Sequence, residues 1–142
     1  MLSSSYKHEA HNLKTEVARG KSSRVIVMDS ITRVTPEDAG AIVVCASHGG
    51  SSSGHFALEV PLAAVFFNDA GVGKENAGIA ALDMLQAKGV AAGTVAHTTA
   101  KIGDPQDTWD SGVISYLNNA ARSLGLSPGM RLCIALTELV SR

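Results

Sequence analysis

Short apolar runs separated by polar turn residues dominate the pattern of the chain from residue 24 onward. Four of these runs have the length and the β-branched or continuously apolar character of buried strands. They cover residues 24–30, 41–46, 62–67 and 90–96. Because a strand that is apolar at every position is typical of a sheet covered on both faces, these runs predict one buried sheet.

Segments with a helical repeat lie between and after the predicted strands. In residues 74–88, Ile79, Leu82 and Leu85 share one stripe, and Gly89 stands where a helix commonly ends. Helices are also predicted over 53–60, 108–124 and 127–140.

The alternation of strands and helices predicts an α/β fold, a three-layer α/β/α (Rossmann-like) domain with a four- or five-stranded, mostly parallel sheet. The apolar run at 131–136 is the alternative fifth strand, although we interpret it first as part of the last helix. Residues 1–23 are polar and carry charges of both signs without strong periodicity, which predicts an N-terminal arm or a short surface helix. Residues 24–142 are then a single α/β domain.

Composition narrows the class of protein. The 142 residues suffice to bury the core of one domain, and 45% of them are hydrophobic but only 4% aromatic, as in a domain packed with Ala, Val and Leu. The net charge of -1 comes without a basic stripe, so a nucleic-acid partner is not expected. No apolar stretch approaches the ~18 residues of a membrane span, so no membrane partner is expected either.

The cysteines and the first residues of the sequence bear on the expected cellular location of the protein. Cys45 and Cys133 lie in apolar runs and form no paired motif, so we interpret both as buried, reduced thiols. Residues 1–14 lack the apolar stretch of a secretory signal. We therefore expect a cytoplasmic protein.

Polar side chains gather where the predicted strands end. Ligands of parallel α/β sheets bind outside the carboxyl ends of the strands, so these side chains predict a functional site at that edge. The candidate catalytic residues are Ser47, His48, Asp69 and His97. Ser47 is the candidate nucleophile, with His48 or His97 as its base and Asp69 as the orienting carboxylate.

The turns at the same edge supply a predicted substrate- or anion-binding set. Its members are Gly49, Gly50, Ser51, Asn68, Gly71, Gly73, Lys74 and Thr98. Gly71 and Gly73 lead into a predicted helix whose free amides, together with Lys74, can hold a carboxylate or phosphate. A nucleotide-hydrolysing phosphate loop is not expected, because Asn68 and Glu75 replace the glycine and the hydroxyl residue of that pattern.

A short segment resembles part of another catalytic motif. Residues 50–54, GSSSG, match the letters of the G-x-S-x-G nucleophile elbow, and residues 48–50 resemble part of the oxyanion loop of lipases and esterases. An elbow carries its serine immediately after a strand, whereas Ser52 comes six residues after Ala46. We therefore interpret the segment as a flexible, amide-rich turn.

Together these features predict an enzyme of small-molecule metabolism that acts on a small polar, anionic substrate. Amide or ester hydrolysis is the first reaction class, and isomerase or lyase chemistry is the second. The alternative is a non-catalytic small-molecule-binding, regulatory or assembly subunit. No cofactor is predicted, and no metal either, although a metal held by His48, His97 and Asp69 stays open. We expect a homo-oligomer, because a small chain commonly completes its pocket with a neighbour.

Overall fold

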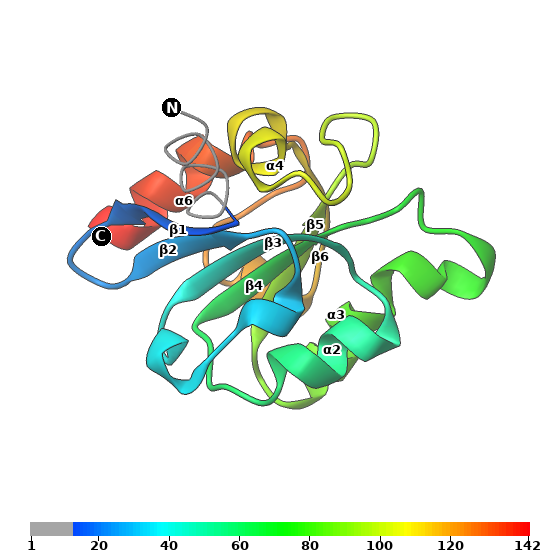
Figure 1. Cartoon of the computed structure of the whole chain (residues 1–142), viewed down its shortest axis with the longest axis horizontal. Helices are drawn as coiled ribbons and strands as arrows, with labels where there is room; N and C mark the ends of the chain where they lie inside the picture. Colours follow the sequence, from blue (N-terminus) through cyan, green and yellow to red (C-terminus); the bar gives the residue numbers. More distant parts are fainter. Residues whose placement is uncertain (1–12) are drawn as a thin grey trace, which may run out of the picture.

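A six-stranded sheet forms the centre of the computed structural model, which describes residues 13–142 (Figure 1). Its strands are β1 (Lys14–Arg19), β2 (Arg24–Met28), β3 (Ile42–His48), β4 (Ala64–Asn68), β5 (Ala91–Val95) and β6 (Ile114–Leu117). The strands lie side by side in chain order. β2 to β5 are parallel neighbours, whereas β1 pairs antiparallel with β2 and β6 antiparallel with β5.

Helices connect and cover the strands. The α-helices of the described residues are α2 (Ser51–Ala57), α3 (Ala80–Ala87), α4 (Pro105–Ser111), α5 (Asn119–Arg122) and α6 (Leu132–Ser141). Three 3-10 helices accompany them: η1 (Ile31–Arg33), η2 (Pro36–Asp38) and η3 (Lys74–Ile79). None of the helices in residues 13–142 has the length and apolar character needed to cross a bilayer.

Two apolar clusters form the core, one on each face of the sheet. Ile42 and Val44 of β3 belong to the first cluster, together with leucines of α6. Val43 and Cys45 belong to the second, together with side chains of α2 and α3. Figure 1 accordingly shows α2 and α3 on one side of the sheet, with α4 and α6 on the other. The strands are apolar at every position because both faces of the sheet are buried, as the sequence predicts.

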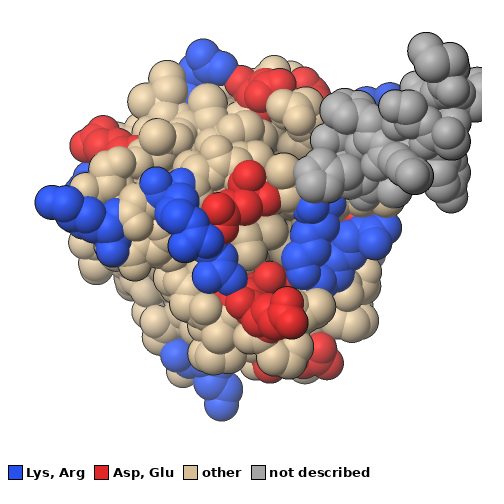
Figure 2. Space-filling model, turned by 60° about the vertical axis from the view of Figure 1, so that its left-hand side comes forward, with Lys and Arg blue, Asp and Glu red and all other residues tan. Residues whose placement is uncertain are grey.

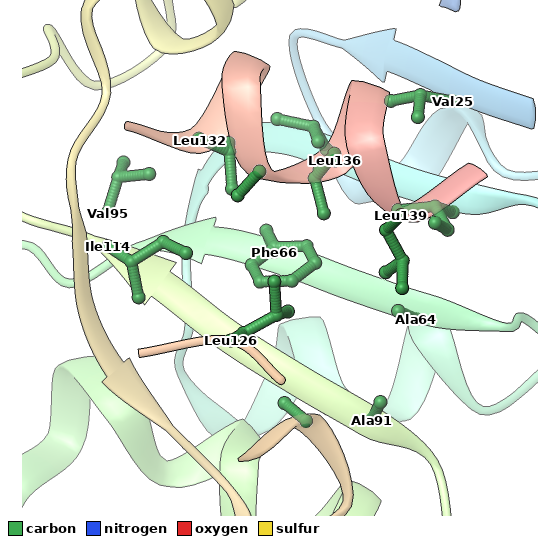
Figure 3. Close-up of a cluster of buried hydrophobic side chains, with 14 of the residues drawn as sticks. Val25, Ala64, Phe66, Ala91, Val95, Ile114, Leu126, Leu132, Leu136 and Leu139 are labelled. Atoms are coloured by element: carbon green, nitrogen blue, oxygen red, sulfur yellow. The ribbon is translucent and has the colours of Figure 1, made fainter. Parts of the chain in front are cut away.

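The first cluster centres on Phe66 of β4, which is fully buried. Figure 3 shows Leu132 and Leu136 of α6 lying over this ring, with Ile114 of β6 beside it. Burying a large apolar side chain contributes about 1.5–3 kcal/mol, so these contacts stabilise the packing of α6 on the sheet. The predicted last helix is confirmed by α6, and the alternative strand at 131–136 is wrong.

The predicted α/β class and mostly parallel sheet are confirmed, but the sheet has six strands and not the predicted four or five, because an antiparallel strand lies at each edge. The strand order never reverses, whereas a doubly wound sheet has a reversal at which ligands bind. The Rossmann-like part of the prediction is therefore not confirmed.

One added strand comes from the segment predicted as a polar arm or surface helix. Residues 14–19 form β1 instead, and the rest of that prediction, residues 1–12, lies outside the described residues. An ion pair of 2.9 Å between Lys14 and the buried carboxylate of Asp38 ties this strand to η2. Charged positions are common on edge strands, because they oppose pairing with another chain, and they conceal the strand in the sequence.

The other added strand lies in the middle of the segment 108–124, which the sequence predicts as one continuous helix. The prediction of a helix is wrong for this middle part. α4 ends at Ser111, and the chain turns at Gly112, where a Cβ would lie 2.4 Å from the carbonyl oxygen of Thr108. β6 follows and ends at Leu117, directly before Asn118. The amide oxygen of Asn118 caps α5 by accepting from the backbone N–H of Ala121, and it also accepts from the backbone N–H of Ala92 on β5. The long-range bond to Ala92 and the pairing of β6 with β5 override a local repeat of apolar residues that resembles a helix.

The predicted helix over 74–88 is divided in two. Glu75 and Asn76 have left-handed φ angles of 56° and 59°, so only residues from Ala80 onward continue as an α-helix. The predicted helix over 53–60 is confirmed as α2, with its start two residues earlier.

Candidate functional site

The carboxyl ends of β3, β4 and β5 meet at one edge of the sheet. His48 is paired with Asn68, and Asn68 with Val95. Asp69 follows immediately after the end of β4, and His97 comes two residues after the end of β5. The structure therefore brings the four candidate catalytic residues to a common edge, because the intervening connections are crossovers between parallel strands.

Asp69 and His97 form a direct pair at this edge. The Asp69 side chain is buried, and its Oδ1 atom accepts hydrogen bonds from the backbone N–H of Gly71 at 2.8 Å and that of His97 at 3.1 Å. The Nδ1 atom of His97 lies 3.2 Å from the same oxygen. The His97 side chain is 54% exposed, so the imidazole is fixed at one end and open to solvent at the other.

The charge of Asp69 decides which nitrogen of His97 carries a proton. Burial acts to raise the pKa of this carboxyl, but hydrogen bonds from Gly71, Ser115 and His97 outweigh it and hold the pKa below its ordinary value of 3.8. At neutral pH the group is therefore a carboxylate, which only accepts hydrogen bonds. The Nδ1 atom of His97 must then be the donor, so its Nε2 atom is free to accept a proton.

Ser115, which lies on β6, contacts this pair but is not among the residues predicted from the sequence. Its hydroxyl is 2.8 Å from that of the fully buried Thr94, and it also contributes to the low pKa of Asp69. The misassigned helix over 108–124 concealed this residue. The β-branched pair at positions 113 and 114, directly after a glycine, is the local signal that indicates a strand here.

Ser47 is poorly arranged as a nucleophile. Its hydroxyl donates to Sγ of Cys45 at 3.2 Å and accepts from the backbone N–H of Ile31 at 3.2 Å. The proton of the hydroxyl therefore points to sulfur and not to an imidazole. Burial raises the pKa of the Cys45 thiol to about 12, so this thiol is not a nucleophile either.

His48 makes a different hydrogen bond from His97. Its Nδ1 atom accepts from the backbone N–H of Gly50 at 3.1 Å, and its ring is exposed. The carbonyl oxygen of His48 accepts from the hydroxyl of Ser53 at 2.6 Å, which fixes the start of α2 against the end of β3. In the neutral ring the proton is then on Nε2.

Asn68 joins the loops at this edge and is not available to a substrate. The side chain is fully buried, its Nδ2 donates to the carbonyl oxygen of Ala100 at 3.0 Å, and its Oδ1 accepts from the N–H of Ala70 at 2.8 Å. The loops after β4 and β5 are thereby held to one strand end, which fixes the backbone around Asp69 and His97.

The backbone amides of the four glycines in the predicted binding set are not free, because each donates a hydrogen bond within the protein. Gly49 N–H donates to the carbonyl oxygen of Asn68, and Gly73 N–H to that of Gly71. The amides of Gly50 and Gly71 are bonded to His48 and Asp69. The remaining predicted binding side chains are exposed, and none of them makes a side-chain hydrogen bond or ion pair among the described contacts. They are Ser51, Lys74 and Thr98.

Two of the glycines here allow close packing. A Cβ on Gly49 would lie 2.9 Å from the carbonyl oxygen of Gly78, and a Cβ on Gly78 would lie 2.2 Å from that of Asp69. The loop between β4 and α3 therefore lies directly on the backbone at the start of α2.

The same loop is unusual in its backbone. Ala70, Val72, Glu75 and Asn76 all have left-handed φ angles, which are uncommon for residues other than glycine. The N–H of Val72 bonds to the carbonyl oxygen of Asp69 at 2.7 Å, and this folds the loop back on the strand end. A Cβ on Gly71 would lie 3.6 Å from the His97 ring, so the loop forms one wall beside that imidazole.

Several charged side chains elsewhere in the described residues form ion pairs. Glu16 lies 2.7 Å from Arg19 and 3.5 Å from Arg24, and Arg33 pairs with Asp29. Figure 2 shows basic and acidic side chains intermixed on the face it displays, without an extended field of one sign. Among residues 13–142, no group of three or more His, Cys, Asp or Glu side chains is placed to hold a metal ion.

No protein-family model matches the chain, and comparisons with curated proteins and with solved structures find no match. The site is therefore interpreted from its own geometry.

Proposed function

We propose that the chain is an enzyme of small-molecule metabolism that hydrolyses an amide or ester of a small polar, anionic substrate. His97 is its general base, and Asp69 holds this base in place. The observation that carries the proposal is the hydrogen bond between the buried carboxylate of Asp69 and Nδ1 of the exposed His97. A carboxylate in this position fixes the ring and stabilises the imidazolium that forms when Nε2 accepts a proton.

Water is the nucleophile in this proposal. Nε2 of His97 takes a proton from a water molecule, and the water oxygen attacks the substrate carbonyl. As the tetrahedral intermediate collapses and the C–O or C–N bond breaks, the proton on His97 passes to the leaving oxygen or nitrogen. The sequence favoured Ser47 for this step, but its hydroxyl donates to Cys45. Isomerase or lyase chemistry, the second reaction class, uses the same base to take a proton from carbon.

Other parts of the sequence-based interpretation remain proposals. Helices on both faces of the sheet support a three-layer α/β/α arrangement. Lys74, which is exposed beside the site's loop, is the cation we propose for a substrate carboxylate or phosphate. A cytoplasmic location agrees with the buried Cys45 thiol.

The test is a hydrolysis screen with small anionic esters, amides and lactones. We expect wild-type protein to consume at least one class, and His97→Gln and Asp69→Asn to lower turnover by about 10²–10⁴-fold. The matched control is His55→Gln, because His55 is an exposed histidine on α2. Equal turnover in wild type and His97→Gln would exclude His97 as the base.

An apolar surface groove favours the alternative, a subunit of an assembly. A groove of about 590 Å³ between β1, α4 and α6 is lined partly by Val17, Trp109 and Ile134. Ile134 is 60% exposed within this groove, and contiguous exposed apolar surface is typical of protein–protein contacts. If this face joins copies in the proposed homo-oligomer, Ile134→Glu lowers the mass measured by sedimentation equilibrium and leaves the far-UV spectrum unchanged.

A further inference from the structure

Two hollows adjoin at the edge of the sheet opposite the candidate catalytic residues, where the parallel strands begin. One hollow, of about 270 Å³, is lined by the turn between β1 and β2 and by the residues before β3. The other, of about 160 Å³, is lined by the first residues of β3 and β4 together with Leu124 and Leu139. Ser22 and Ser23 line both hollows, so one ligand can extend from the first into the second.

The larger hollow is basic. Its lining includes Arg19, Lys21 and Arg24 and, within the described part of the chain, no Asp or Glu side chain. Glu16 pairs with both arginines from outside the lining, at 2.7 and 3.5 Å. Three cations beside one carboxylate leave an excess of two positive charges here. Lys21 is exposed and makes no side-chain hydrogen bond or ion pair among the described contacts. An anion is the ligand that this charge distribution favours.

The smaller hollow is apolar. Ile42, Ala64 and Leu139 line it, and all three belong to the first core cluster. Figure 3 shows Leu139 of α6 and Ala64 of β4 at the same end of the sheet. An apolar cavity of about 150 Å³ in another protein is large enough to bind benzene. A phenyl ring or a short alkyl chain is therefore the group whose size suits this hollow.

The turn that carries the cations is bonded to the elements on both sides of it. The N–H of Ser22 donates to the carbonyl oxygen of Val140 at 3.0 Å, and the hydroxyl of Ser23 donates to that of Gly40 at 2.7 Å. A Cβ on Gly20 would lie 2.2 Å from the Val140 oxygen, so the turn lies directly on the end of α6. The backbone beneath the cations is therefore held beside the apolar hollow before a ligand binds, which lowers the entropic cost of binding.

We propose that the two hollows together bind a small amphiphilic anion. Its carboxylate or phosphate lies at Lys21 and the two arginines of the basic hollow, and its apolar group, of about the size of a phenyl ring, lies against Ile42 and Leu139. The inference goes beyond the proposed hydrolysis and does not depend on it, because this site lies at the other edge of the sheet. A ligand here bridges the turn between β1 and β2, the end of α6 and the starts of β3 and β4.

The first test compares 3-phenylpropionate with two probes that each carry half of its chemistry, 3-phenylpropanol and acetate. Amide ¹H–¹⁵N spectra of the full chain follow each titration. We expect 3-phenylpropionate to bind with a Kd of about 1 mM or lower and each half-probe to bind about tenfold more weakly or worse. The shifted signals should include those of Lys21, Ser22 and Ile42. Equal affinity for the acid and the alcohol, or shifts confined to other parts of the protein, overturns the proposal.

The second test removes a charge from the basic hollow. Lys21→Gln replaces an exposed side chain, so the fold should be unchanged. We expect the affinity for 3-phenylpropionate to fall about 3–10-fold and to depend less on ionic strength than in wild type. The matched control is Lys101→Gln, which removes another exposed lysine after the far end of β5. Equal affinities of the two variants contradict the placement of the anion.

The third test fills the apolar hollow and leaves its charged neighbour intact. Ala63 is exposed at this hollow, so Ala63→Phe places a ring where the ligand's ring would lie. We expect affinity for 3-phenylpropionate to fall at least to that of acetate. The control is Ala87→Phe, an exposed change on α3. Unchanged affinity in Ala63→Phe shows that the apolar hollow takes no part in binding.

Thermal unfolding gives a readout that needs no signal assignment. A ligand that binds only the folded chain raises its melting temperature, so 3-phenylpropionate should stabilise wild type and Ala87→Phe but not Ala63→Phe. Phenyl phosphate in place of 3-phenylpropionate identifies the preferred head group, and tighter binding of either one than of its half-probes supports the site. Absence of stabilisation and of binding for both anions in wild type overturns it, whatever the hydrolysis screen finds.

Discussion

Asp38 and Asp69 are both buried carboxylates, with only 4% of each residue exposed, but they are placed for different tasks. Asp38 accepts from the ammonium of Lys14 at 2.9 Å and from the backbone N–H of Thr35 at 2.8 Å. The ammonium of Lys14 also donates to the carbonyl oxygen of Arg33. Both charged groups are therefore bonded to neighbouring parts of the protein, and these bonds stabilise the junction of β1 with η2.

The partner of Asp69 is His97, whose ring is exposed on the side away from the carboxylate. His97 uses Nδ1 for the carboxylate and leaves Nε2 in an exposed ring, beside a loop with an unusual left-handed backbone. Such backbone costs of order 1–3 kcal/mol per residue and is concentrated at functional sites. Burial and pairing are therefore common to both carboxylates, and the two differ in whether the partner keeps an exposed atom with no described bond.

The largest difference between the two carboxylates should appear in turnover. Asp69→Asn removes the charge that holds His97 in the tautomer with a free Nε2, so we expect turnover to fall by about 10²–10⁴-fold. Asp38→Asn should leave turnover unchanged, since Asp38 lies at the junction of β1 and η2. Initial rates with a substrate from the screen measure both variants, and equal losses would remove the distinction.

The next effect should appear in stability. Asp38→Asn leaves the ammonium of Lys14 without its partner, but the Lys14 side chain is 30% exposed and keeps part of its hydration. We expect a loss of about 1–3 kcal/mol in the free energy of unfolding, less than for a fully buried pair. Urea unfolding followed by circular dichroism gives the value. The control is Glu16→Gln, which breaks an exposed pair on β1 and should cost about 0–1 kcal/mol.

A smaller effect should appear as a dependence of stability on pH. The pKa of Asp69 in the folded protein lies below its ordinary value of 3.8. The stability from this group is therefore fully present above about pH 4 and is lost as the pH falls through the lower folded pKa. Wild type should lose more stability than Asp69→Asn over this acid range. Parallel curves for the two proteins in urea titrations between about pH 5 and pH 2 would contradict the assignment.

The smallest effect should come from Ser47. Its hydroxyl bonds to Cys45 and Ile31, so Ser47→Ala should lower turnover by less than about tenfold and stability by about 1 kcal/mol. Loss of a catalytic serine nucleophile costs about 10⁶-fold, a result that would restore Ser47 to the role the sequence favoured. Ser52→Ala, an exposed change on α2, is the matched control.

The sequence by itself determined the parallel centre of the sheet and the edge at which its polar residues meet. Continuous apolar runs such as that in β3 are a direct consequence of burial on both faces, so they are readable without coordinates. Chain order then brings Asp69 and His97 to neighbouring strand ends, because parallel strands need crossovers.

Only the tertiary structure decided the edges of the sheet and the roles within the site. Lys14–Arg19 is too charged to be recognised as a strand, and its place depends on pairing with β2 and on Asp38 far along the chain. β6 shares a local repeat with a helix, and its place depends on the side chain of Asn118 and on bonds to β5. The proposed role of His97 and the poor arrangement of Ser47 follow from single hydrogen bonds, which the spacing of residues along the chain does not specify.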